Sequence, residues 1–147
     1  DRVHTLFRKG MLTPTTTLAL RETAMRGCGL SGAKIRAIRN LAHKVECGEL
    51  DLATLPAMKD EDVVAELTTV KGIGPWTAEM VLMFSLGRVD VFSKGDLGLQ
   101  KGMMQLYGLK TFLSEKKLLM RARTWSPYRT YAARVLWKVA DQKKIRS

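Results

Sequence analysis

Hydrophobic residues recur along much of the chain at the three- and four-residue spacing of helices that bury one face. The clearest stripe lies between Ser31, a suitable N-cap, and Gly48, a glycine placed to end the helix. Its members are Ile35, Ile38, Leu41, Ala42 and Val45. No segment shows a convincing strand pattern. The sequence therefore predicts an all-α fold, a helical bundle.

Further helices are expected on both sides of this one. They are predicted at residues 14–26, 60–70, 75–86, from about 96, 114–123 and 127–141, with a short segment at 52–58 and an irregular stretch at 88–95. The helix at 75–86 is almost entirely apolar, so we expect it to be buried on most sides. No internal repeat, low-complexity segment or linker interrupts the pattern, which favours one domain over 1–147.

Charge changes this picture because it is unevenly distributed. The net charge is +11. Residues 1–90 carry 12 Lys/Arg and 11 Asp/Glu, whereas residues 91–147 carry 13 Lys/Arg and 3 Asp/Glu. A half-chain this basic favours a polyanionic partner, and nucleic acid is the first candidate. A solvated basic face on a basic protein is the alternative. The sequence shows no strongly amphipathic basic helix of the kind that binds a membrane surface.

Several classes of protein are disfavoured by composition. A hydrophobic content of 46% argues against disorder. No apolar run approaches the roughly 18 residues that a membrane span needs. Two cysteines, Cys28 and Cys47, are too few for a disulfide framework or a four-thiolate cluster. The first residue is not Met, so we expect a fragment or a processed chain.

The turn Lys71-Gly72-Ile73-Gly74 joins two predicted helices, and Pro75 opens the second one. Glycines permit the backbone angles that a tight hairpin needs and leave the backbone N–H groups uncovered. Beside a helix N-terminus, such groups form a site for a phosphate oxygen. We expect Ile73 to point inward and lock the turn. A plain helix-turn-helix with glycine caps is the alternative interpretation.

Three segments together resemble a known family. Residues 62–87 are similar to the helix-hairpin-helix of the DNA glycosylase superfamily, and DVFSKGDLGLQKG (90–102) resembles its catalytic-aspartate segment. SPYRTYAARVLW (126–137) resembles the closing helix of the branch of 3-methyladenine DNA glycosylase II. The likeness runs from about 13 to 138. It implies a base-excision repair enzyme that hydrolyses the N-glycosidic bond of alkylated purines.

The resemblance places Asp96, 22 positions after Gly74, on the catalytic aspartate. A carboxylate there would stabilise the positive charge that develops on the deoxyribose as the base leaves, and would orient or deprotonate water. Lys94 and Lys101 are expected to keep this acid ionised. Without the resemblance, an ordinary N-cap is the first interpretation of an Asp that precedes a helix. The other acids are Asp90, expected to cap a helix or pair with an Arg, and Glu79.

The resemblance also implies a pocket for an extruded base. Aromatic walls hold a cationic base by stacking and cation–π attraction, and the candidates are Trp76, Met80, Trp125 and Tyr128. Tyr131 and Trp137 are assigned to core packing. Trp76 stands where family members that also cleave the DNA backbone have a lysine, so we expect a monofunctional enzyme without lyase activity.

Contacts with double-stranded DNA are expected at the hairpin. The resemblance assigns the backbone amides of Gly72, Ile73 and Gly74 and the side chain of Lys101 to phosphates. It assigns a structural Na⁺ or K⁺ to main-chain carbonyls, and requires no other cofactor. Those carbonyls belong to Thr68, Val70 and Ile73.

Departures from the family pattern leave two other functions open. Lys71 and Ser93 each replace a usual proline, and Ser93 is expected to loosen the segment that positions Asp96. The early helices of the family and its wedge residue, which fills the gap left by the flipped base, should precede Thr13, so the domain is expected to be N-terminally incomplete.

The alternatives are a non-enzymatic DNA-binding module and a glycosylase for another lesion. We expect a monomer, located where the genome is, in a nucleus or a bacterial cytoplasm.

Overall fold

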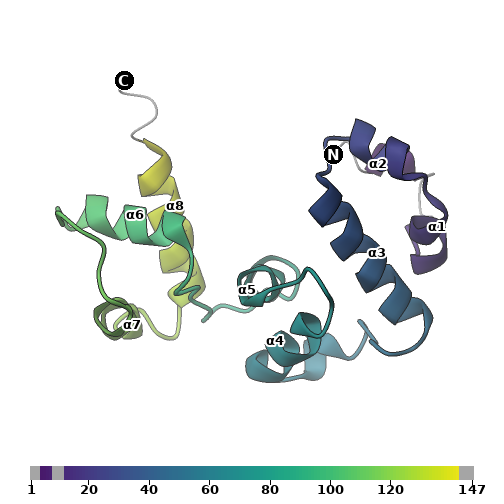
Figure 1. The fold of residues 1–147 in the computed structure, drawn as a ribbon. Helices are drawn as coiled ribbons and strands as arrows, with labels where there is room; N and C mark the ends of the chain where they lie inside the picture. Colours follow the sequence, from purple (N-terminus) through teal and green to yellow (C-terminus); the bar gives the residue numbers. More distant parts are fainter. Residues whose placement is uncertain (1–3, 8–11, 143–147) are drawn as a thin grey trace. The chain divides into compact units, whose positions relative to one another are not determined.

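The computed structural model describes residues 4–7 and 12–142, and within them every regular element is helical. Besides α-helices there are two short 3-10 helices, η1 (His4–Leu6) and η2 (Leu55–Ala57). The predicted all-α class is confirmed. The chain divides into two compact units, residues 1–78 and 79–147 (Figure 1). The single domain expected over 1–147 stays a prediction.

The first unit is built around its longest helix. It contains α1 (Pro14–Ala19), α2 (Glu22–Gly27), α3 (Gly32–Glu46) and α4 (Asp60–Thr68), and both α1 and α2 pack against α3 (Figure 1). The Ser31 hydroxyl accepts the Lys34 N–H, so the predicted N-cap is confirmed. The buried side chains of this unit include Met25, Ile35, Leu50, Leu55, Val63, Leu67 and Val70.

The prediction of one helix over 14–26 is wrong, because α1 and α2 are separated by an extended break at Leu20 and Arg21. Threonines at the start of α1 bond locally, as when Thr17 Oγ1 donates to the Thr13 carbonyl at 2.7 Å. At the break, Arg39 of α3 donates to the Leu20 carbonyl at 2.6 Å. The Leu20 carbonyl thus accepts a hydrogen bond from a distant side chain, whereas in a continuous helix it would accept a backbone N–H of the same helix.

The second unit holds α6 (Leu97–Leu106), α7 (Glu115–Arg123) and α8 (Arg129–Gln142), with α6 packed against α8 (Figure 1). The helix α5 (Pro75–Phe84) begins in the first unit and ends in the second. The predicted start near residue 96 is confirmed, as is the irregular stretch before it. The core of this unit includes Leu82, Met83, Val91, Phe92, Leu99, Met103, Leu118, Ala122, Ala133 and Leu136.

The expectation that the apolar helix at 75–86 is buried on most sides is wrong for its two ends. Ala78, Leu82 and Met83 are buried, but Trp76 is 52% exposed and Phe84 is 59% exposed. The low polar content of this helix therefore does not determine how much of it is buried, because single exposed apolar residues are common on protein surfaces. In the described part of the chain, no helix combines the length and apolar character needed to cross a bilayer.

Candidate functional site

The hairpin between α4 and α5 is fixed by one glycine rather than by both. Gly72 has φ +100°, and a Cβ added to it would lie 2.8 Å from the Cβ of Ala37 on α3. Only glycine combines that backbone with so close an approach. Gly74 has no positive φ, and a Cβ there would meet nothing within 4 Å. The expectation that both glycines supply special backbone angles is therefore confirmed only for Gly72.

Backbone and side-chain hydrogen bonds hold the same turn. The Ile73 N–H donates to the Val70 carbonyl at 2.9 Å, and Asn40 of α3 donates to the Lys71 carbonyl at 2.9 Å. The Lys71 side chain is exposed, so lysine in place of proline is accommodated without burying a charge. Ile73 is half-buried rather than fully inward. The turn is thus held by α3 as well as by its own two helices.

Asp96 caps the N-terminus of α6 and is only 8% exposed. Its Oδ1 accepts the backbone N–H of Leu99 at 2.8 Å, and its own N–H donates to the Ser93 carbonyl at 3.2 Å. Oδ1 also accepts the indole Nε1–H of Trp137 at 3.0 Å. These two N–H donors hold the carboxylate in one orientation at the start of the helix. Asp96 is therefore an N-cap, yet its second donor lies 41 residues away.

Trp137 is the residue that sequence reasoning missed. It was assigned to core packing, but its indole is half-buried and donates to Asp96. Its ring also lies against Phe84 at the end of α5, with the centroids 5.9 Å apart. Nothing in the local pattern distinguishes this tryptophan from a packing residue, because the contact depends on how α8 lies against α6.

The expectation that Ser93 loosens the segment before Asp96 is wrong. Ser93 is fully buried and donates a short hydrogen bond to the carboxylate of Glu79 on α5. Serine therefore replaces the rigidity of a proline ring with a side-chain bond to the neighbouring helix. Glu79, considered above as a rival acid, is the acceptor in this bond.

The two lysines near Asp96 in the sequence lie in different surroundings in the structure. Lys94 forms an ion pair with Glu115 at 2.7 Å, and the hydrogen bond to Glu115 raises the pKa of Lys94. Lys101 is exposed on α6. The hydrogen bonds that Asp96 accepts include those from the N–H groups of Leu99 and Trp137. That the two lysines keep the acid ionised stays a prediction.

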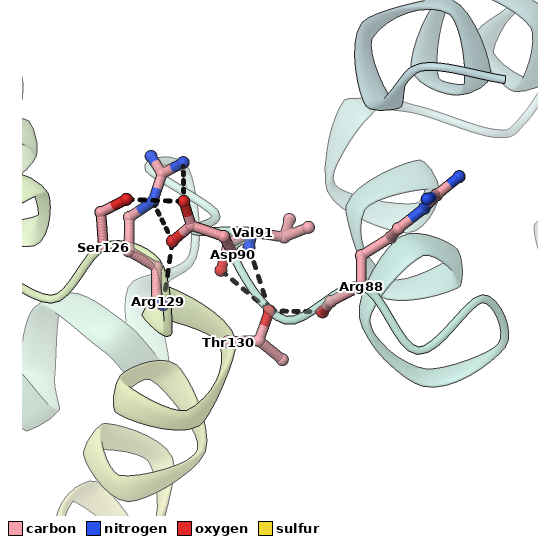
Figure 2. Close-up of polar contacts among 6 residues, drawn as sticks. All are labelled: Arg88, Asp90, Val91, Ser126, Arg129 and Thr130. Carbon is pink, nitrogen blue, oxygen red and sulfur yellow. Dashed lines mark hydrogen bonds and ion pairs between the residues drawn. The ribbon is translucent and has the colours of Figure 1, made fainter.

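Asp90 confirms its expected structural role at the start of α8 (Figure 2). Its carboxylate accepts bonds from Arg129 Nε at 2.7 Å, Arg129 Nη2 at 3.0 Å, the Arg129 backbone N–H at 3.1 Å and the Ser126 hydroxyl at 2.8 Å. Beside it, the Thr130 hydroxyl donates to the Arg88 carbonyl at 2.7 Å and accepts the Val91 N–H at 3.0 Å. Together these bonds tie residues 88–91 to α8, which carries Trp137.

This ion pair predicts acid-sensitive stability. The side-chain hydrogen bond from Arg129, assisted by Ser126 and opposed by burial, lowers the pKa of Asp90 from 3.8 to about 2. A folded-state pKa below the unfolded value stabilises the protein above pH 4, and the contribution disappears as the pH falls towards 2. A shift of this size corresponds to about 2 kcal/mol. Chemical denaturation at several pH values should show that contribution.

Asp90→Asn is the comparison that isolates the effect. The difference in unfolding free energy between wild type and variant should be greatest above pH 4 and shrink between pH 4 and pH 2. A difference that stays constant over this pH range would contradict the assignment, because the stabilisation would then not depend on ionised Asp90.

The pocket candidates occupy different positions. Trp76 is exposed in the first turn of α5, and Met80 is half-buried one turn later. Trp125 is half-buried, with its ring 5.9 Å from that of Phe92. Tyr128 is 60% exposed, and its ring lies 6.2 Å from that of Tyr131. Their role as walls of a base pocket stays a prediction.

The proposed cation site can be judged by its donors. Thr68 ends α4, where helix carbonyls lack partners within the helix and carry partial negative charge. Val70 already accepts the Ile73 N–H, but a carbonyl oxygen has a second lone pair. Among the described residues, no group of three or more His, Cys, Asp or Glu is placed to hold a metal. Carbonyl oxygens are ligands that suit a hard cation, and a Na⁺ or K⁺ site at Thr68, Val70 and Ile73 stays a prediction.

Comparison with known proteins finds one matching family and several similar DNA glycosylases. Residues 2–128 match the family described as "HhH-GPD superfamily base excision DNA repair protein". DNA-3-methyladenine glycosylase 1 of Schizosaccharomyces pombe is 35% identical over 117 residues, which are 79% of this chain and 51% of that protein. The chain spans about half the length of the curated relatives it matches.

Two solved structures are also similar. The 3-methyladenine DNA glycosylase Mag1 of Schizosaccharomyces pombe, in complex with abasic DNA, has a TM-score of 0.80 and 31% identity, over 93% of this chain and 68% of that one. A DNA-3-methyladenine glycosidase from Bacillus halodurans has a TM-score of 0.75 and 44% identity, over 95% of this chain and 64% of that one.

Proposed function

This chain belongs to the HhH-GPD superfamily of base excision DNA repair proteins, and from that membership we propose that it excises alkylated purines from double-stranded DNA. The reaction is hydrolysis of the N-glycosidic bond, which leaves an abasic site. The similar glycosylases from Schizosaccharomyces pombe and Bacillus halodurans support 3-methyladenine as the type of substrate. Such an enzyme acts where the genome is, as a monomer.

The observation that carries the proposal is the setting of Asp96. A nearly buried carboxylate is held by the Leu99 and Trp137 N–H groups, 22 positions after the last glycine of the hairpin. Departure of an alkylated base leaves positive charge on the deoxyribose, and an oriented carboxylate stabilises that charge. The base is already cationic, so it needs no strong general acid. One carboxylate therefore suffices where sugar hydrolases use two.

Lyase activity is not part of the proposal, because Trp76 stands where lyase members of the family have their amine nucleophile. Strand cleavage would need an amine that attacks the sugar to form a Schiff base. Lys94, the lysine nearest to Asp96 in sequence, has its ammonium group paired with Glu115.

DNA binding is assigned to the hairpin. The N–H groups of Gly72 and Gly74 would bind a backbone phosphate beside the N-terminus of α5, with Lys101 as a further phosphate contact. The N–H group of Ile73 was expected to do the same, but it already donates to the Val70 carbonyl within the turn. A Na⁺ or K⁺ bound by the carbonyls of Thr68, Val70 and Ile73 would supply positive charge next to that phosphate. The extruded base would stack on the aromatic candidates Trp76, Trp125 and Tyr128, beside Met80.

The test uses end-labelled duplex DNA that contains one 3-methyladenine. We expect strand breaks only after hot alkali, because excision leaves an abasic site that alkali cleaves. Borohydride added during the reaction should trap no protein–DNA adduct. Breaks without alkali together with a trapped adduct would contradict the monofunctional assignment, since both need an amine nucleophile.

A non-enzymatic DNA-binding module is the second candidate, favoured by the glycine hairpin and by the basic half of the chain. A module would bind the duplex with strong salt dependence and release no base. Release of hypoxanthine or mispaired adenine, in place of 3-methyladenine, would instead identify a glycosylase for another lesion.

A further inference from the structure

The helix α6 carries two glycines one turn apart, Gly98 and Gly102. Each glycine inside a helix costs about 1 kcal/mol relative to alanine, so a helix with two of them needs a compensating contact. Neither glycine has a positive φ, so neither is needed for its backbone angles. Being four residues apart, both lie on the same face of α6, and α6 packs against α8.

Gly102 lets the two helix backbones touch. It is buried, and a Cβ added there would lie 2.2 Å from the Leu136 carbonyl oxygen and 2.7 Å from its carbon. These are main-chain atoms of α8, which cannot move aside as a flexible side chain can. Any side chain at this position would push α8 away from α6 next to Trp137.

Gly98 leaves room for the hydrogen bond at Asp96. A Cβ added there would lie 2.9 Å from Asp96 Oδ1, 2.9 Å from Trp137 Cδ1 and 3.2 Å from Trp137 Nε1. Two of these atoms, Trp137 Nε1 and Asp96 Oδ1, are the partners of the hydrogen bond that is 3.0 Å long, and Cδ1 is bonded to Nε1 in the indole. A methyl group at Gly98 would therefore press on both partners of this bond.

We propose that Gly98 and Gly102 are positioning residues: by lacking side chains, they let Trp137 on α8 orient the carboxylate of Asp96 at the start of α6. Gly102 sets the distance between the helices, and Gly98 leaves the space in which the indole meets the carboxylate. The inference rests on the proposed function in one respect, that Asp96 acts on the substrate. The role of Gly98 is therefore steric.

The test compares Gly98→Ala with Gly95→Ala. Gly95 is adjacent to Asp96 but has no positive φ, and a Cβ there would meet nothing within 4 Å, so its alanine variant is a matched control. Trp137→Phe keeps an aromatic ring and removes the N–H donor together with part of the indole. Gly102→Ala is added for the helix contact, and thermal melting identifies any variant that does not fold.

The first readout is spectroscopic and does not depend on activity. The chain has three tryptophans, and the indole N–H resonance missing from Trp137→Phe is that of Trp137. In Gly98→Ala this resonance should move and exchange faster with water, whereas in Gly95→Ala it should stay in place. A wild-type resonance in folded Gly98→Ala would overturn the proposal.

The second readout separates chemistry from binding on 3-methyladenine DNA. A carboxylate displaced by about 1 Å can lower a rate by roughly 100-fold. Single-turnover excision by Gly98→Ala and Trp137→Phe should therefore fall by about 10- to 100-fold, with DNA affinity within about threefold of wild type. Unchanged excision by both variants would overturn the proposal.

The variant Asp96→Asn keeps the two hypotheses separable. If Asp96→Asn excises normally, the catalytic role of Asp96 fails, whatever Gly98→Ala does. If Asp96→Asn is inactive while Gly98→Ala and Trp137→Phe match wild type in rate and resonance, only the positioning role fails. If the wild-type chain excises nothing, the resonance of Trp137 still decides whether Gly98 sets the contact.

Discussion

Asp96→Asn is expected to lower the single-turnover rate of base excision by at least about 100-fold, with DNA affinity unchanged or increased. Asparagine retains a carbonyl oxygen, which can accept the N–H groups of Leu99 and Trp137 as Oδ1 of Asp96 does. The cap and the contact with α8 therefore remain, and the negative charge is lost. The variant removes the stabilisation of the developing positive charge on the sugar and also a charge that repels phosphate.

The measurement is excision of 3-methyladenine from a labelled duplex at saturating protein, with affinity measured separately by titration. Asp90→Asn is the control, because Asp90 begins the segment 90–102 that contains Asp96 but is bound to Arg129. This control should lose stability and retain excision at neutral pH. Equal excision by wild type and Asp96→Asn would remove Asp96 from the mechanism, and loss of DNA binding would indicate structural damage instead.

Gly72→Ala is expected to destabilise the chain by about 2–5 kcal/mol and to weaken DNA binding. About 1–2 kcal/mol of this arises from the left-handed backbone angle, and overpacking against α3 adds about 1–3 kcal/mol. The added methyl group would lie 2.8 Å from the Ala37 Cβ and 3.2 Å from its Cα. Since these atoms belong to a helix, the turn must move, and its N–H groups would lose their alignment towards a phosphate.

Chemical denaturation of Gly72→Ala and Gly74→Ala measures the effect on stability. In Gly74→Ala the new methyl group has open space, so its stability should stay within about 1 kcal/mol of wild type. Binding of undamaged duplex at several salt concentrations then measures the phosphate contact of Gly72→Ala. Equal stability of the two variants would show that the turn tolerates a side chain at either position.

The sequence predicted most of the local structure because local structure depends on residues within about one helical turn of each other. Ser31 accepts an N–H three residues later, and Asp96 does the same. Pro75 begins its helix as expected. The failure at 14–26 was of a different kind, because Arg39 takes the Leu20 carbonyl from 19 residues away. No periodicity within the segment contains that contact.

The features of the candidate site also fall into two groups, those that the sequence predicted and those that depend on tertiary packing. The sequence located the glycine turn and the helix cap at Asp96, because both are local features, and the resemblance to the glycosylase family singled out Asp96 as the candidate catalytic acid. Tertiary structure decided that Trp137 binds Asp96, that Ser93 is anchored by Glu79, and that Gly98 and Gly102 leave room for α8. Each of these last contacts joins different helices or segments, so the packing of those elements determines it. Two glycines in successive turns of α6 were the visible signal, because such a helix gives up stability that only close packing recovers.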